Sequence, residues 1–308
     1  MMARLGRTDL EVFPLCLGGN VFGWTADEQQ SFAILDAYAA AGGNFVDTAD
    51  AYSAWVPGHV GGESETIIGR WMASRGARAR MIVATKVGRG PGLQGLASKT
   101  IRAGAEASLR RLGVDSIDLY YAHADDPETP LEETLRAFDA LVKEGKVRYI
   151  AASNYTAPRL AKALEISKRE GLAQYIAVQP HYNLVHRGDY EGALADLSVQ
   201  EGVACVPYFA LAMGFLSGKY RPGVKVESAR ADSARKYLND RGIRLLGVLD
   251  EIASIHRVPV AAVSLAWLLA QKGVAAPIAS ARTVEQLAEL LPVAHLSLSE
   301  AEVRSLTL

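Results

Sequence analysis

The chain has 308 residues, of which 49% are hydrophobic and 22% are charged, and its formal net charge is −1. This composition supports a large buried core and argues against disorder, and without a basic cluster it argues against a nucleic-acid partner. No run approaches the ~18 apolar residues of a membrane span, and no apolar segment follows the first basic residues. The cysteines, Cys16 and Cys205, lack metal or redox spacing. We therefore expect a cytoplasmic protein with two reduced, buried thiols.

In chain order, eight short apolar runs predict β-strands. These runs cover residues 12–17, 44–48, 81–86, 117–122, 147–152, 175–179, 203–208 and 275–279. Most are nearly continuous apolar runs, which is typical of parallel strands covered on both faces. The segments between them carry helix signals, such as Pro130 before and Gly145 after one apolar helical repeat, and Ser98 as a cap and Gly113 as a stop for another.

Strands that alternate with helices predict βαβ units in one parallel sheet. Eight units close a (β/α)8 TIM barrel, which we expect to form a single domain over residues 1–308, with a hairpin in residues 4–12 below the barrel and extra C-terminal helices. The competing fold is a doubly wound open sheet. It requires a G-x-G-x-x-G turn directly after a strand, and the first glycines, Gly18, Gly19 and Gly23, lack that spacing. The irregular residues 218–232 are either a functional cover or a surface excursion.

Polar side chains follow seven of the eight predicted strands. They are Asp47 with Tyr52 in the next loop, Lys86, His123, Ser153 with Asn154, Gln179, Tyr208, and Ser280 with Arg282. Because a barrel brings the carboxyl ends of its strands together, we expect these side chains to share one mouth.

Four of these residues have chemistry together. A phenol with a pKa of about 10 is a poor acid at neutral pH. A neighbouring Lys86 ammonium would lower the pKa of Tyr52, and Asp47 would hold Lys86 charged. His123 would donate a hydrogen bond to the substrate oxygen or relay the proton. The set suits a carbonyl that becomes an alkoxide as hydride arrives, and it needs no metal.

In order and context, Asp47, Tyr52, Lys86 and His123 resemble the catalytic tetrad of the aldo-keto reductase superfamily. The resemblance covers essentially the whole chain and extends to further segments. These are residues 145–154, 62–65, 68–69, 178–179, 182–183 and 214–220, of which the last three look like the bacterial branch related to potassium-channel β-subunits.

The resemblance implies NADPH, with NADH less favoured, bound extended over the barrel, and Tyr52 as general acid. Its implied cofactor-binding residues are Gly19, Asn20, Ser153, Asn154, Gln179, Tyr208, Phe209, Ala210, Leu211, Gly214, Lys219, Ser280, Arg282, Gln286 and Glu289. Ser153, Asn154 and Gln179 would hold the nicotinamide carboxamide, and Tyr208 would stack on its ring. Arg282 would clamp a 2′-phosphate, although Thr283 and Gln286 also fit a capping box that serves helix stability alone.

Two positions depart from the family pattern. Phe209 stands where a small residue often follows the stacking tyrosine, and Ala279-Ser280 stands where many relatives carry Pro-Gly. These departures concern the expected shape of the loop at the pyrophosphate and the geometry at the adenosine end.

On the substrate side, Trp24, Trp55 and Phe22 are expected to wall an apolar pocket, whereas Trp71 and Trp267 are expected in the core. His181, His186, Asp125 and Asp126 match no catalytic metal motif, so no metal is expected.

Three functions follow from these patterns. The first is an NADPH-dependent reductase of aldehydes or ketones. The second is a metal-dependent barrel hydrolase that uses His123, His181 and carboxylates. The third is a catalytically weak NADPH-binding regulatory module. The expected partner is a small-molecule carbonyl compound, and the sequence predicts no oligomeric state.

Overall fold

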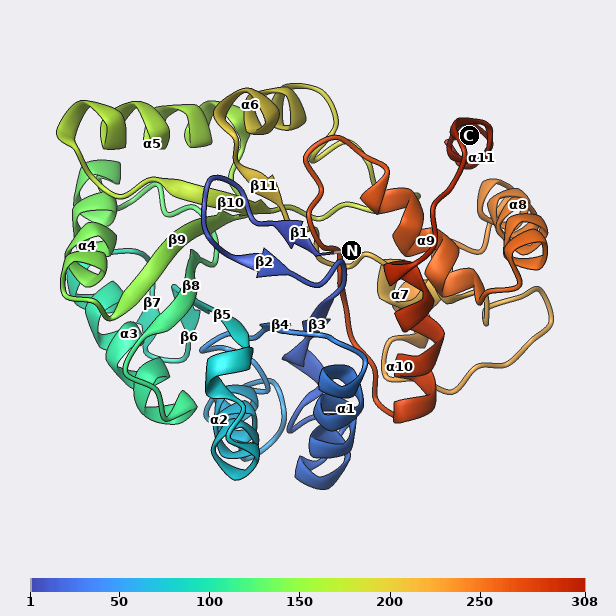
Figure 1. The fold of residues 1–308 in the computed structure, drawn as a ribbon, viewed down its shortest axis with the longest axis horizontal. Coiled ribbons are helices and arrows are strands. Elements are labelled where there is room, and N and C mark those ends of the chain that lie inside the picture. Colours follow the sequence, from blue (N-terminus) through green and yellow to red (C-terminus); the bar gives the residue numbers. More distant parts are fainter. Residues whose placement is uncertain (1, 308) are drawn as a thin grey trace.

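The computed structural model describes residues 2–307 and shows eight parallel strands that curl into a barrel (Figure 1). The strands are β3 (Cys16–Gly18), β4 (Phe45–Asp47), β5 (Ile82–Val87), β8 (Ile117–Ala122), β9 (Val147–Ser153), β10 (Tyr175–Gln179), β11 (Ala204–Cys205) and β12 (Ile278–Ala279). They lie in the order β11-β10-β9-β8-β5-β4-β3-β12. Hydrogen bonds from Ala275 N to Cys205 O (2.9 Å) and from Ile278 N to Pro207 O (2.9 Å) join the two ends. The predicted (β/α)8 barrel is confirmed.

Four barrel strands are shorter than predicted. Of these, β4 loses one residue at each end of its predicted run, and the three that are shortened most, β3, β11 and β12, come from runs that contain a proline. The first run contains Pro14, and its β3 begins only at Cys16. The seventh and eighth runs contain Pro207 and Pro277. A proline has no N–H to donate to a strand ladder, so regular pairing stops beside it. The apolar pattern located these strands correctly but overestimated their length.

The predicted N-terminal hairpin is confirmed. Strands β1 (Ala3–Arg4) and β2 (Glu11–Val12) pair in antiparallel fashion. Leu5, Leu10 and Val12 are buried and pack in one cluster with the side chains that fill the barrel interior. The hairpin therefore closes the amino end of the barrel, and the carboxyl ends of the strands remain the accessible mouth.

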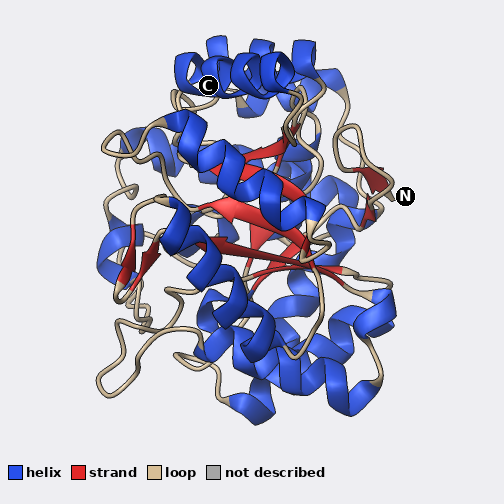
Figure 2. Ribbon diagram, turned by 90° about the vertical axis from the view of Figure 1, so that its left-hand side faces the viewer, coloured by secondary structure: helices blue, strands red, loops and turns tan. Residues whose placement is uncertain are grey.

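Helices surround the sheet on its outer face (Figures 1 and 2). They are α1 (Glu28–Ala40), α2 (Glu63–Arg75), α3 (Ser98–Leu112), α4 (Leu131–Lys143), α5 (Ala157–Glu170), α6 (Ala193–Glu201), α7 (Ala231–Arg235), α8 (Asp240–His256), α9 (Val260–Leu269), α10 (Val284–Leu290) and α11 (Glu300–Leu306). Pro130 and Gly145 flank α4 as predicted. Ser98 is the first residue of α3 rather than its cap, because the capping position falls on Ala97. Trp71 and Trp267 are buried, as expected.

The chain ends in the extra helices that were predicted. On α8, His256 Nε2 lies 2.7 Å from Glu302 Oε1 on α11, which ties the last helix to the molecule. Among the described residues, no single helix is long and apolar enough to cross a membrane. Only α8 and α9 taken together pass such a test, and they are bent by 96° at their junction. Both cysteines are free and buried, as predicted.

Candidate active site

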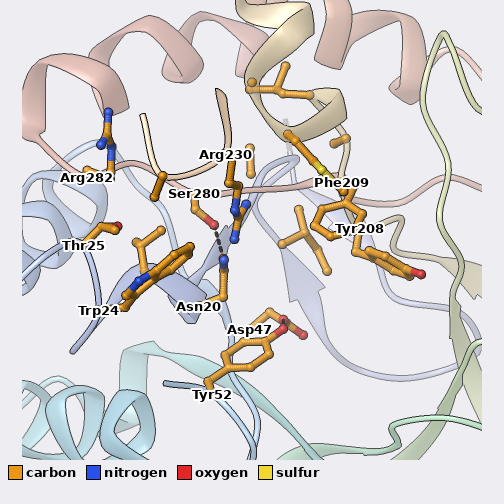
Figure 3. A pocket seen from close by; sticks show the side chains of 18 of the residues that line it. Asn20, Trp24, Thr25, Asp47, Tyr52, Tyr208, Phe209, Arg230, Ser280 and Arg282 are labelled. Carbon is orange, nitrogen blue, oxygen red and sulfur yellow. Dashed lines mark hydrogen bonds between the residues drawn. The ribbon is translucent and has the colours of Figure 1, made fainter. Parts of the chain in front are cut away.

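A cavity of about 390 Å³ opens at the carboxyl ends of the strands (Figure 3). It gathers most of the residues that the sequence assigned to a site. These are Asn20, Trp24, Asp47, Tyr52, Trp55, His123, Ser153, Asn154, Gln179, Tyr208, Phe209, Ala210, Leu211, Gly214, Lys219, Ser280, Arg282 and Gln286. The structure thus brings residues from all eight strand ends, separated by up to 266 positions, around one space.

Lys86 lies at the centre of the polar network beneath this cavity. Its Nζ donates to Asp47 Oδ2 (2.6 Å), to Thr48 O (2.8 Å) and to the Tyr52 hydroxyl (2.9 Å). Both charged side chains of the pair are almost fully buried, with about 1% of Lys86 and of Asp47 exposed. All three hydrogens of the ammonium are therefore used, which fixes its position relative to the phenol.

Neighbouring strands set this geometry. Asp47 ends β4, where it pairs with Ala84 of β5, and Lys86 lies two residues further along on the same face. Gln179, at the end of β10 across the barrel, donates from Nε2 to Asp47 Oδ1 at 2.9 Å. The carboxylate is thus held from both sides, by an ammonium and by an amide.

The pKa of Tyr52 differs from the expectation. Burial raises the pKa of its phenol well above the usual value of 10, and the Asp47 carboxylate raises it further. The prediction of a lowered Tyr52 pKa is wrong for the resting site, because burial and the Asp47 carboxylate outweigh the effect of neighbouring positive charge. Tyr52 therefore stays protonated at neutral pH.

His123 stands beside Tyr52, with ring centroids 6.3 Å apart. Burial lowers its pKa well below the usual 6.5, and the positive charges of Lys86 and Arg89 lower it further. The imidazole is therefore neutral at neutral pH and carries a single ring N–H. Its Nδ1 is buried and makes no hydrogen bond with the described residues.

Asp50 is a buried carboxyl on the same loop as Tyr52, with 4% of the residue exposed. Burial and the nearby Glu65 raise its pKa from 3.8 to about 7. Folding therefore takes up a proton between these pH values, and the stability due to this group falls as the pH rises through that window, by up to about 4 kcal/mol.

The Asp50→Asn variant is expected to remove this titration. Because the amide carries no charge at any pH, the variant gains stability over wild type at about pH 8, and the gain shrinks toward about pH 4. Urea denaturation at both pH values measures the difference. A gain of equal size at the two pH values would show that the Asp50 carboxyl does not titrate as described.

The side chains predicted to hold the nicotinamide form one connected group. Asn154 Nδ2 donates to His123 O (2.9 Å) and to Ser153 Oγ (3.0 Å), and Asn154 Oδ1 accepts from the Tyr208 hydroxyl (2.8 Å). Asn154 has a left-handed backbone with φ of 57°, which turns the chain at the end of β9. Ser153 Oγ donates to Gln179 O at 3.0 Å.

The segment that follows Tyr208 is strained along the cavity wall. Phe209, Ala212 and Met213 have backbone φ values of 52°, 47° and 58°, which lie in the left-handed region that residues other than glycine seldom adopt. Asn183 Nδ2 donates to Phe209 O at 2.9 Å and helps to hold this conformation. The departure from the family pattern at Phe209 therefore coincides with a strained backbone.

Three cations line the part of the cavity beyond this segment: Lys219, Arg230 and Arg282. Their side chains make no ion pair with the described residues. Arg230 instead lies over two aromatic rings, 5.4 Å from the centroid of Trp24 and 5.8 Å from that of Phe209. The Arg230 guanidinium projects into the cavity between Trp24 and Tyr208 (Figure 3).

Of the two hydrogen bonds of the capping box predicted at the start of α10, one is present. Thr283 Oγ1 accepts from Gln286 N at 3.2 Å, as an N-cap does. The Gln286 side chain does not return to Thr283 N as a reciprocal box requires; it accepts from Arg282 N at 3.0 Å. Gln286 thereby orders the backbone of Arg282 and leaves the guanidinium free.

Several lining residues were not predicted from the sequence: Val21, Thr25, Arg89, Met213, Ser228, Ala229, Arg230 and Ile278. Three of them, Ser228, Ala229 and Arg230, lie within the irregular residues 218–232. The structure therefore favours the interpretation of that stretch as a cover of the cavity. The length and polarity of the stretch were the available signal. Nothing in the sequence marked Arg89.

A few predicted residues lie outside the cavity lining. Gly19 faces away, and its carbonyl accepts from Ser64 Oγ at 2.8 Å. Glu289 lies on α10, where its charge acts on Lys219. Phe22 was expected on the pocket wall but is fully buried in the core.

The two predicted tryptophans form one wall of the mouth. The rings of Trp24 and Trp55 meet edge to face with centroids 5.5 Å apart, and Trp55 lies 6.1 Å from the Tyr52 ring. Half of Trp55 is exposed to solvent. An apolar substrate portion that lies beside Tyr52 would contact this wall.

Among residues 2–307, one group has the geometry to hold a metal: His181, His186 and Asp189. His123 is not part of it. The His181 and His186 rings are stacked with centroids 3.7 Å apart, beneath Tyr208. Asp125 and Asp126, which the sequence analysis considered as metal ligands, have other partners: Asp125 pairs with Arg159 at 2.7 Å, and Asp126 accepts from Leu96 N at 2.7 Å.

Comparison with known proteins agrees with this geometry. The model of the aldo/keto reductase family matches residues 14–307. An uncharacterized oxidoreductase, YrpG, of Bacillus subtilis is 35% identical over 98% of this chain and 93% of its own. Norsolorinic acid reductase B of Aspergillus parasiticus is 32% identical over 96% and 80%, and a probable voltage-gated potassium channel subunit beta of Oryza sativa is 33% identical over 93% and 88%. The chain is therefore an oxidoreductase that belongs to the aldo/keto reductase family.

Proposed function

We propose that this protein is an NADPH-dependent reductase of aldehydes or ketones, with Tyr52 as the proton donor. The observation that carries the proposal is the Tyr52 hydroxyl, held 2.9 Å from a buried ammonium at the floor of the cavity. NADPH bound there would supply the hydride. A protonated phenol beside a fixed positive charge is poised to protonate the alkoxide that forms on the substrate.

Each member of the tetrad has a distinct task in this proposal. Tyr52 gives its proton to the carbonyl oxygen, and Lys86 stabilises the phenolate that is left behind. Asp47 fixes Lys86 and takes no proton itself. His123, which is neutral, donates its ring N–H to the same carbonyl oxygen and orients the substrate.

The charges of the cavity support an extended dinucleotide phosphate as its ligand. The one carboxylate of the lining, Asp47, is already paired with Lys86, and Lys219, Arg230 and Arg282 face the cavity without an ion pair to the described residues. Cations in this state bind phosphates. Ser153, Asn154 and Gln179 would hold the carboxamide, Tyr208 would stack on the ring, and Arg282 would bind the 2′-phosphate. Residues 1–308 would act as a single domain.

Arg282→Ala is expected to weaken NADPH binding roughly 10- to 100-fold while it changes NADH binding little, because charged hydrogen bonds contribute about 1.5–3 kcal/mol. Arg230→Ala is the matched control, because in this proposal Arg230 binds the pyrophosphate. Since the pyrophosphate is common to both cofactors, this variant should weaken the binding of NADPH and of NADH by the same factor. Fluorescence titrations with each cofactor measure the four dissociation constants. Equal losses of NADPH and NADH in Arg282→Ala would contradict the 2′-phosphate assignment.

The proposed function itself is tested with purified protein, NADPH and a panel of aldehydes and ketones. We expect NADPH binding and carbonyl reduction that a metal chelator does not affect. Hydrolytic activity that chelation abolishes and zinc restores would favour the metal-dependent hydrolase. NADPH binding without turnover of any carbonyl would favour the regulatory module, and the similarity to the rice potassium channel subunit beta supports this alternative.

A further inference from the structure

One cation at the mouth is not used by the proposed cofactor site. Arg89 begins the short hairpin of β6 (Arg89–Gly90) and β7 (Leu93–Gln94), directly beyond β5. It lines the same cavity as Tyr52 and His123. Its side chain is exposed, and its guanidinium makes no hydrogen bond or ion pair with residues 2–307. An arginine free of partners beside a reaction site is available to bind an anion.

The electrostatic effects of the cavity cations separate Arg89 from Lys219 and Arg282. Arg282 acts on Lys219 and on Arg230, and Arg230 also interacts with Tyr52, so Arg230 lies between the adenosine side and the reaction site. Arg89 acts on His123 and on Tyr208. Arg89 therefore lies on the side where the nicotinamide and the carbonyl would meet.

The phosphates of the cofactor can be matched without Arg89. A dinucleotide phosphate carries three phosphorus centres, two in the pyrophosphate and one at the 2′ position, and Lys219, Arg230 and Arg282 supply three cations for them. Arg89 is the fourth cation of the lining apart from His123, which is neutral. Bound cofactor would leave Arg89 without a phosphate partner, next to the open substrate space.

We propose that Arg89 forms an anion subsite that selects carbonyl substrates carrying a carboxylate or phosphate remote from the reacting carbonyl. The proposal rests on the proposed function and specifies its substrate class. In this arrangement Tyr52 and His123 bind the carbonyl oxygen, the Trp24–Trp55 wall contacts the apolar middle of the substrate, and Arg89 binds the far anionic group. Arg89 specifies the substrate and takes no part in proton transfer.

The test compares two aldehydes of nearly equal shape, para-carboxybenzaldehyde and its methyl ester. We expect wild type to prefer the carboxylate in kcat/KM, and Arg89→Ala to reduce the ratio of the two kcat/KM values roughly two- to fivefold, which corresponds to loss of one exposed charge pair. Arg89→Glu should reverse the preference. Arg80→Ala removes an exposed arginine that precedes β5, at the end of this strand away from the cavity, and should leave the ratio of the two kcat/KM values unchanged.

A second measurement does not depend on turnover. Calorimetry measures the binding of para-(hydroxymethyl)benzoate and of its methyl ester to the NADPH-loaded protein, a complex that cannot react. The carboxylate should bind more tightly than the ester in wild type and lose that advantage in Arg89→Ala. An equal affinity for both alcohols, or an advantage that persists without Arg89, would overturn the subsite. Reduction of the methyl ester reports the general reductase activity. If Arg89→Ala still reduces the ester and the ratio of the two kcat/KM values is unchanged, the anion subsite is rejected and the reductase function stands. If wild type reduces neither aldehyde, the proposed function itself is rejected.

Discussion

Replacing Tyr52 with phenylalanine is expected to lower kcat by several orders of magnitude, near the upper end of the about 10²–10⁴-fold that a positioned proton donor contributes. The phenol is the one donor that both faces the cavity and contacts the Lys86 ammonium, at 2.9 Å. Phenylalanine keeps the ring that packs against Trp55 and loses only the hydroxyl. NADPH affinity should therefore remain nearly intact, and NADPH oxidation with fluorescence titration measures the two effects separately.

The matched control is Tyr149→Phe. It removes a hydroxyl that donates to Asp9 Oδ1 (2.7 Å) far from the cavity, near the N-terminal hairpin. This variant should retain the wild-type rate. A Tyr52→Phe enzyme with a rate close to wild type would remove the proton-donor role from Tyr52.

The fold could be predicted from the sequence because its signals are local. Apolar runs located all eight strands, and the alternation with amphipathic segments indicated a closed parallel sheet. The errors lie at strand ends, where one residue type overrides the pattern. Pro14, Pro207 and Pro277 each interrupt a run whose hydrophobicity continues across it, because burial depends on the side chain and pairing depends on the N–H.

The residues of the candidate site also divide into those that the sequence predicts and those that it does not. Residues at strand ends were predicted, since the barrel fixes where strand ends meet. Arg89 and Arg230 were missed because they lie in segments that connect the barrel strands and helices, Arg89 in a short hairpin and Arg230 in a loop, where the direction of a side chain depends on packing that no short pattern records. Arg230 enters the cavity through its contacts with Trp24 and Phe209, which come from distant parts of the chain.

The direction of the Tyr52 pKa shows the limit of reasoning from residue types. An ammonium near a phenol lowers the pKa of the phenol, and an aspartate near it raises that pKa. Which effect prevails depends on distances and burial. Here burial has the largest effect, and Asp47, which lies 2.6 Å from Lys86 Nζ and 3.2 Å from the Tyr52 hydroxyl, adds to it. The resting site therefore keeps the proton that catalysis needs.

Replacing Lys86 with methionine is expected to abolish turnover and also to destabilise the protein. Methionine fills a similar volume but leaves the Asp47 carboxylate buried without a cation, a change that costs about 3–5 kcal/mol in comparable sites. The phenolate that forms during turnover would also lose its stabilising charge. Urea denaturation measures the first effect and NADPH oxidation measures the second.

The double variant Asp47→Asn/Lys86→Met separates the two effects. The amide is neutral, its oxygen can take the place of Oδ1 and accept from Gln179, and its NH2 group can take the place of Oδ2 and donate to the Tyr52 hydroxyl, so most of the lost stability should return. Turnover should not return, because no ammonium remains beside the phenol. If the double variant recovered activity together with stability, Lys86 would be needed only to neutralise Asp47, and the proton transfer would have to depend on another group. If both stayed lost, the stability of this region would rest on contacts of Lys86 other than its ion pair, such as the bond to Thr48 O.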